Sequence, residues 1–107
     1  MPGGECWKLV RDRVAREIAG EGRPVRRLEG RELEEYLLAK IVEEARELAE
    51  TGDPEEAGDL LEALLAWARL RGLTLADIER IAAAKRRERG GFDEGLAALV
   101  DCVGPQG

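Results

Sequence analysis

Apolar residues recur every three or four positions in four stretches of the chain, which is the spacing of a helix with one buried face. Glycines and short charged breaks separate these stretches. They predict helices over 7–19, 31–50, 53–71 and 74–88. Pro54 falls in the first turn of the third helix, where a proline fits because that turn has no amide to lose.

The breaks between the helices define the fold class. The second and third helices are joined so tightly that they are expected to lie antiparallel. Segment 23–30 is expected to be a loop with one short extended stretch, and the tail to add a turn of helix over 96–100. The fold prediction is all-α: an antiparallel bundle of about four helices, one domain over 1–107 with a core over 7–96 and flexible ends.

Composition narrows the chemistry that the chain can perform. The 107 residues have a formal net charge of −6, which argues against a nucleic-acid polymer as partner because phosphate backbones need a positive surface. The chain has no His, Ser or Asn, which removes Ser-His triads, Cys-His dyads and imidazole metal sites. Carboxylates remain as the candidate metal ligands.

The apolar and cysteine residues of the chain predict its cellular location and its oligomeric state. No apolar run approaches the roughly 20 residues that span a bilayer, and the start lacks an export signal, so a cytoplasmic protein without membrane partners is expected. Cys6 and Cys102 lack metal-site or disulfide spacing and are expected to play no role. A thin core and an apolar surface covering over half of the third helix predict a homodimer or higher oligomer.

Four carboxylates stand out when the helices are projected at about 100° per residue. Glu44 falls within the apolar arc of the second helix, with Glu47 at its margin. Glu56 falls on the apolar side of the third helix, with Asp59 at its edge. Burying an unpaired carboxylate is costly, so the inward acids call for a cation. Ligand sets made of oxygen alone favour Mg²⁺, with Mn²⁺ as a substitute, and Mg²⁺ is typically shared with phosphates.

A simpler interpretation remains open from these residues alone. With 37% of residues charged, two Glu residues three positions apart usually form a solvated face of a helix. Glu56 could also complete a capping box with Asp53, three residues before it.

Three motifs occur in order along the chain. Segment 7–13 reads W-K-L-V-R-D-R, segment 43–59 contains E-E-x-x-E followed by E-x-x-D, and segment 88–92 reads E-R-G-G-F. Together they resemble the K-L-V-R-D-K-I start, the acidic signature and the R-G-G-F ending of MazG-like proteins. This superfamily of all-α nucleoside triphosphate pyrophosphohydrolases includes phosphoribosyl-ATP pyrophosphohydrolase. The gap between the acidic motifs is shorter here than in many members, which leaves the substrate open.

The resemblance implies a hydrolase that cleaves a nucleoside triphosphate to a monophosphate and pyrophosphate by in-line attack of water. The family's Mg²⁺ ligands correspond to Glu44, Glu47, Glu56 and Asp59. Glu43 would orient a ligand or water, and Glu43 or Glu62 would accept the proton. The alternatives are phosphoribosyl-ATP hydrolysis for histidine synthesis, or a non-catalytic helical oligomerisation module without metal dependence.

Basic residues near both ends of the chain are the candidate contacts for the outer phosphates. The predicted substrate-binding residues are Lys8, Arg11, Arg13, Lys85 and Arg89. Lys8 and Arg11 are predicted to share one helix face. These cations could equally be surface charges, an ion pair of Arg11 with Asp12, or partners of the last helix's dipole. Tyr36, Trp67 and Phe92 are expected to pack rather than stack on a base.

Overall fold

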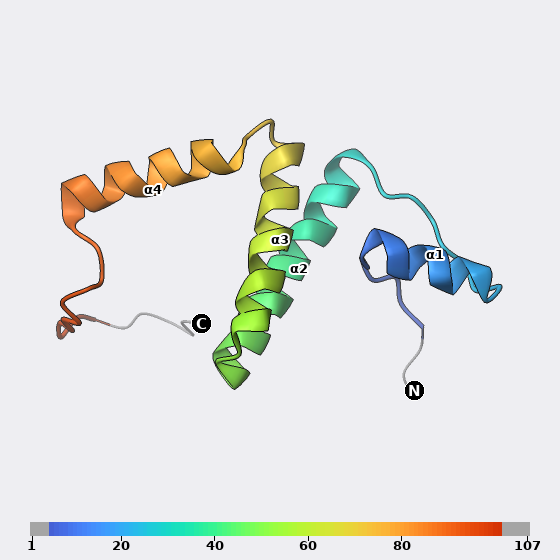
Figure 1. Cartoon of the computed structure of the whole chain (residues 1–107), viewed down its shortest axis with the longest axis horizontal. Helices are drawn as coiled ribbons and strands as arrows, with labels where there is room; N and C mark the ends of the chain where they lie inside the picture. The colour runs from blue at the N-terminus through green and yellow to red at the C-terminus, as the bar shows by residue number, and fades with distance from the viewer. Residues whose placement is uncertain (1–4, 102–107) are drawn as a thin grey trace. The chain divides into compact units, whose positions relative to one another are not determined.

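The protein's computed structural model describes residues 5–101 and is all-helical over them, without a strand. The helices are α1 (Asp12–Gly20), α2 (Gly30–Thr51), α3 (Pro54–Leu70) and α4 (Leu75–Arg89) (Figure 1). The all-α prediction and its four helices are therefore confirmed. Cys102 and the outermost residues of both chain ends lie outside the described residues.

The chain divides into two compact units, Met1–Leu75 and Ala76–Gly107. The first unit contains α1, α2 and α3, and the second contains α4 beyond its first residue together with the tail. The single domain expected from the sequence stays a prediction.

A two-residue junction turns the chain between α2 and α3. Gly52 ends α2 in the left-handed conformation at φ 66°, and its amide donates to the Leu48 carbonyl at 2.8 Å. Asp53 caps α3, because its carboxylate accepts from the Glu55 amide at 2.9 Å. The Asp53 amide in turn donates to the Thr51 hydroxyl at 3.1 Å. These local bonds fix where the two helices meet, and the helices then lie side by side (Figure 1).

The interface between α2 and α3 is the main packed surface of the first unit. Its buried apolar residues are Leu37, Ala63 and Ala68. At one end of the hairpin, the Trp67 indole donates to the Glu34 carboxylate at 3.2 Å. Leu61 on α3 is 45% exposed. The core is thus thin and made mostly of small side chains.

The N-terminal segment corrects the sequence prediction. The first helix begins at Asp12, not at position 7, and residues 7–11 are not helical. Lys8 and Arg11 consequently do not share a helix face. The physical reason is that both side chains form ion pairs with the α2–α3 hairpin, and the segment crosses from one helix to the other to reach them.

One further expectation of local structure is wrong for the described residues. Residues 96–101 contain no turn of helix, whereas residues 23–29 form a loop as expected. The tail offers nothing to support a helix, because Leu96 and Leu99 are almost fully exposed and an isolated short helix is marginal in water. Phe92 is 97% exposed, so it does not pack within its own unit as expected.

Candidate metal centre and its flanking cations

The carboxylates singled out in the sequence converge on one place in the α2–α3 hairpin. Two groups of three acids each present oxygens that lie within 4.8 Å of one another. The groups are Glu43, Glu44 and Glu47 on α2, and Glu44, Glu56 and Asp59 across the two helices. Glu44 belongs to both groups. These five acids are called the carboxylate cluster below.

Glu44 is the buried member of the cluster, with 7% of its surface exposed. Its Oε2 atom has no hydrogen-bond partner, and its Oε1 atom lies 3.7 Å from the Lys40 ammonium. Burial raises the pKa of Glu44, and the negative charge of Glu47 raises it further. The inward projection predicted for Glu44 is confirmed. A buried carboxylate oxygen without a donor is the kind of atom that a cation would satisfy.

Glu56 is half-buried at the first turn of α3. Its pKa is raised by burial first, and then by the charges of Glu47 and Asp59. The capping alternative for Glu56 is wrong, because the amide that it would have to bind, that of Asp53, donates to Thr51 instead. Glu56 therefore adds its charge to the cluster without a structural role as a cap.

Glu43 lies at the edge of the cluster between two lysines. Lys8 donates to its Oε2 at 2.9 Å and Lys40 to its Oε1 at 3.2 Å. The hydrogen bond from Lys8 lowers the pKa of Glu43, and the same bond raises the pKa of Lys8. Lys40 was not among the residues predicted from the sequence. Its positions three and four residues before Glu43 and Glu44 were the available signal, since such residues are neighbours on a helix.

Arg11 pairs with the α3 side of the cluster. Its guanidinium lies 2.7 Å from Oδ1 of Asp59, with the two side chains 60% and 43% exposed. The ion pair considered for Arg11 was with Asp12, and the structure shows a partner 48 positions away instead. Lys8 and Arg11 thus flank the cluster from the same short segment.

The remaining candidates are Arg13, Lys85, Arg89 and Glu62. Arg13 is exposed on α1 and has no ion pair or hydrogen-bond partner within residues 5–101. Lys85 and Arg89 are exposed in the last part of α4, within the second unit. Glu62, considered as a proton acceptor, is paired with Arg69 at 3.5 Å. These positions leave Arg13, Lys85 and Arg89 as predictions without support from contacts to the cluster.

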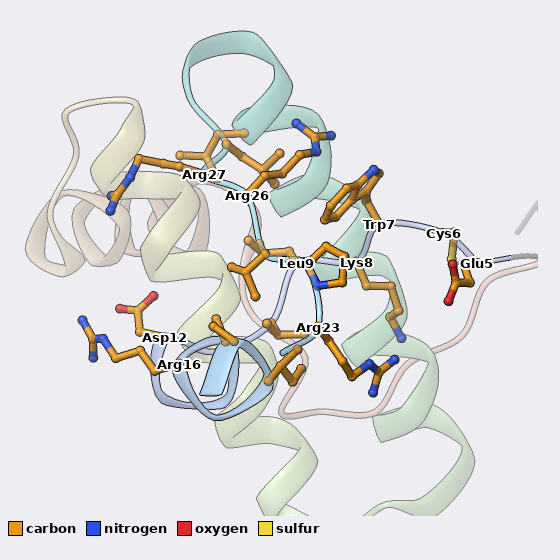
Figure 2. Close-up of a pocket in the computed structure, with 18 residues that line it drawn as sticks. Glu5, Cys6, Trp7, Lys8, Leu9, Asp12, Arg16, Arg23, Arg26 and Arg27 are labelled. Carbon is orange, nitrogen blue, oxygen red and sulfur yellow. The ribbon is translucent and has the colours of Figure 1, made fainter. Parts of the chain in front are cut away.

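A pocket of about 1190 Å³ lies between the N-terminal segment, α1 and the segment that leads to α2. Figure 2 shows Leu9 in its middle, with Trp7 and Arg26 together at its edge. The Arg26 guanidinium carbon lies 4.9 Å from the centre of the Trp7 ring. The same guanidinium forms an ion pair with Glu32. Lys8 lines this pocket while its ammonium contacts Glu43, so the pocket and the cluster meet at Lys8.

The donor set fits an oxygen-preferring divalent cation such as Mg²⁺ or Mn²⁺. All ligand candidates are carboxylates, and the shared residue, Glu44, has one buried oxygen without a partner. Five carboxylates face three cations, Lys8, Arg11 and Lys40. The cluster therefore retains negative charge that a divalent cation would balance.

Within residues 5–101, no helix combines the length and apolar character needed to cross a membrane. Neither the family models, the curated proteins nor the solved structures compared with the chain give a match. The resemblance to MazG-like proteins therefore rests on the sequence motifs and stays a prediction.

Proposed function

We propose that the chain is a Mg²⁺-dependent nucleotide pyrophosphohydrolase, which cleaves a nucleoside triphosphate or related nucleotide to a monophosphate and pyrophosphate. The observation that supports it most is the buried, unpartnered oxygen of Glu44 at the point shared by both groups of acids. A protein that used these acids only as a solvated face would have no reason to bury Glu44. The non-catalytic alternative is disfavoured on that ground.

Under this proposal, Glu44, Glu47, Glu56 and Asp59 hold the cation. Bound Mg²⁺ would supply positive charge to the scissile phosphate and to the attacking water. Lys8 and Arg11 stand at the rim, where ammonium and guanidinium groups suit the outer phosphates. Glu43 is the proposed proton acceptor, because it belongs to the carboxylate cluster without being one of the four proposed cation ligands.

The experiment is a nucleotide panel incubated with Mg²⁺, with pyrophosphate measured separately from phosphate. The panel includes canonical and deoxy triphosphates and phosphoribosyl-ATP, so that the dedicated biosynthetic substrate competes directly with general ones. The wild-type chain should release pyrophosphate and a monophosphate in equal amounts. Release from phosphoribosyl-ATP alone would select the biosynthetic alternative.

Variants connect the activity to the cluster. Glu44→Gln and Asp59→Asn should each lower the rate by about a hundredfold or more, since loss of a cation ligand costs several kcal/mol of transition-state stabilisation. Glu35→Gln is the matched control, because Glu35 is an exposed acid on the same helix. The proposal is wrong if the wild type releases no pyrophosphate from any substrate, or if both cluster variants match it.

A further inference from the structure

The N-terminal segment binds both helices of the hairpin at the rim of the carboxylate cluster. Lys8 reaches Glu43 on α2 at 2.9 Å, and Arg11 reaches Asp59 on α3 at 2.7 Å. The partners are 35 and 48 positions away along the chain. Two independent contacts to two different helices therefore hold this segment against the cluster.

One of these contacts competes with a cation for the same atoms. Asp59 belongs to the group of three acids whose oxygens converge across α2 and α3. In the structure, its Oδ1 accepts the Arg11 guanidinium. A carboxylate oxygen engaged by a guanidinium is a poorer cation ligand, because the guanidinium charge repels the incoming ion. Arg11 should thus oppose cation binding when nucleotide is absent.

Both contacts are of the kind that exchanges readily. The Lys8 and Arg11 side chains are 59% and 60% exposed, and exposed ion pairs contribute little net stability because water competes for both partners. Lys8 also lines the pocket of about 1190 Å³ beside the cluster, so its side chain has open space to move into (Figure 2). Neither the Lys8 ammonium nor the Arg11 guanidinium is held in position by burial.

Charge balance gives the direction of the exchange. Without a divalent cation, Lys8, Arg11 and Lys40 partly neutralise the five carboxylates. A divalent cation at Glu44, Glu56 and Asp59 takes over that neutralisation. Lys8 and Arg11 are then free to donate to phosphate oxygens, which bring new negative charge to the same rim.

We propose that Lys8 and Arg11 are exchangeable cations: they pair with Glu43 and Asp59 as long as no divalent cation is bound, and transfer to the outer phosphates of a polyphosphate when a divalent cation occupies the cluster. This proposal rests on the proposed function for the identity of the site. It adds that metal and nucleotide bind with positive coupling, because each removes an obstacle to the other. Lys8 and Arg11 are then substrate-binding residues whose effect on the cation is opposite to their effect on the phosphates.

The test measures the two affinities separately by calorimetry. The first titration uses Mn²⁺ alone and the nucleotide-free protein, and Arg11→Gln should bind Mn²⁺ several-fold more tightly than the wild type. The second uses a non-hydrolysable nucleoside triphosphate analogue at saturating Mn²⁺, and Arg11→Gln should bind it about tenfold more weakly. Lys8→Gln should show the same opposite changes, with a smaller first effect, because Glu43 lies outside the group that contains Asp59.

Arg46→Gln is the matched control for charge. Arg46 is an exposed arginine on α2, two residues from Glu44, and it has no ion pair or hydrogen bond with a described side chain. It should not reproduce the opposite changes. The exchange is overturned if Arg11→Gln leaves Mn²⁺ affinity unchanged or weakens it, even when pyrophosphate release supports the proposed function. Opposite changes without pyrophosphate release would retain the exchange and reject the proposed reaction, and a wild type that binds no Mn²⁺ would reject both.

Discussion

At the scale of single residues, Glu44 has the features expected of a residue that serves cation binding and lowers the stability of the fold. It is buried, its Oε2 has no partner, and its acidic neighbours oppose its charge. An amide at this position would lose the charge and could donate to Glu47 or Asp59. The carboxylate is therefore the weaker choice for folding and the better choice for holding a cation.

The opposite effects of Glu44 on folding and on cation binding predict the behaviour of a glutamine variant. Glu44→Gln should stabilise the metal-free protein by about 1 kcal/mol, or a few degrees in melting temperature, because it removes a buried charge that Glu47 and Asp59 repel and whose Oε2 atom has no hydrogen-bond partner. It should also abolish stabilisation by Mg²⁺, which for the wild type at about 100 times the dissociation constant is roughly 2.7 kcal/mol. Thermal melts with and without Mg²⁺ check both effects, with Glu35→Gln as control. A destabilised metal-free Glu44→Gln would contradict this and would show that the Lys40 contact at 3.7 Å outweighs the burial and the repulsion from the neighbouring acids.

The same residue predicts a pH dependence. The folded-state pKa of Glu44 is raised above the ordinary 4.5, so the folded chain binds this proton more tightly than the unfolded chain does. Stability from this group is fully present below about 4.5 and is lost as pH rises to the raised pKa. The melting temperature of the metal-free wild type, measured relative to Glu44→Gln, should therefore fall as pH rises through that window. A difference that stays constant from pH 4 to 8 would contradict it.

At the scale of the elements, the junction between α2 and α3 sets which acids meet. Gly52 and Asp53 end one helix and begin the next within two residues, and Glu56 follows in the first turn. The cap on α3 therefore holds a candidate ligand in place as well as the start of the helix.

Asp53→Ala should destabilise the protein by about 1 kcal/mol, because the Glu55 amide loses its acceptor. Asp53→Asn should retain most of the stability, since asparagine is an equally good cap. Urea unfolding of the two variants beside the wild type makes the comparison. Equal losses in both would mean that the charge of Asp53, and not its hydrogen bond, is what matters.

At the scale of the whole molecule, the first unit leaves apolar side chains uncovered. Leu38 and Val42 lie one turn apart on α2 and are 45% and 48% exposed, and Leu61 on α3 is 45% exposed. Because Glu44 meets Asp59 across the hairpin, Val42 and Leu61 lie at neighbouring levels. Exposed apolar groups of this kind favour self-association.

We therefore expect a homodimer or higher oligomer that covers this surface. Light scattering at micromolar concentration should give at least twice the 11.8 kDa mass of the chain. Val42→Glu should return the protein to monomer mass, because a charge would be buried in the interface. Val25→Glu is the matched control, as Val25 is 47% exposed and lies outside α2 and α3. A monomeric wild type, or equal dissociation by both variants, would contradict this surface.

Much of the fold could be predicted from the sequence because its signals are local. Periodicity, the glycine breaks and Pro54 predicted α2 and α3 to within about one residue at each end. The inward projection of Glu44 followed from the same periodicity, before any partner was known. Local signals failed for residues 7–11, whose helical spacing is overridden by contacts with distant acids.

The sequence by itself determined α2 and α3, the acids on them and the inward side of Glu44, because helix geometry fixes the direction of every side chain relative to its neighbours. Only the tertiary structure decided which of those acids share one site and which cations pair with them. It also decided that Glu56 does not cap α3, because the Asp53 amide donates to Thr51. The reason is that ion pairs such as Lys8 with Glu43 and Arg11 with Asp59 join positions far apart along the chain. The spacing of residues along one helix cannot reveal such pairs, because they form only when the N-terminal segment contacts the α2–α3 hairpin.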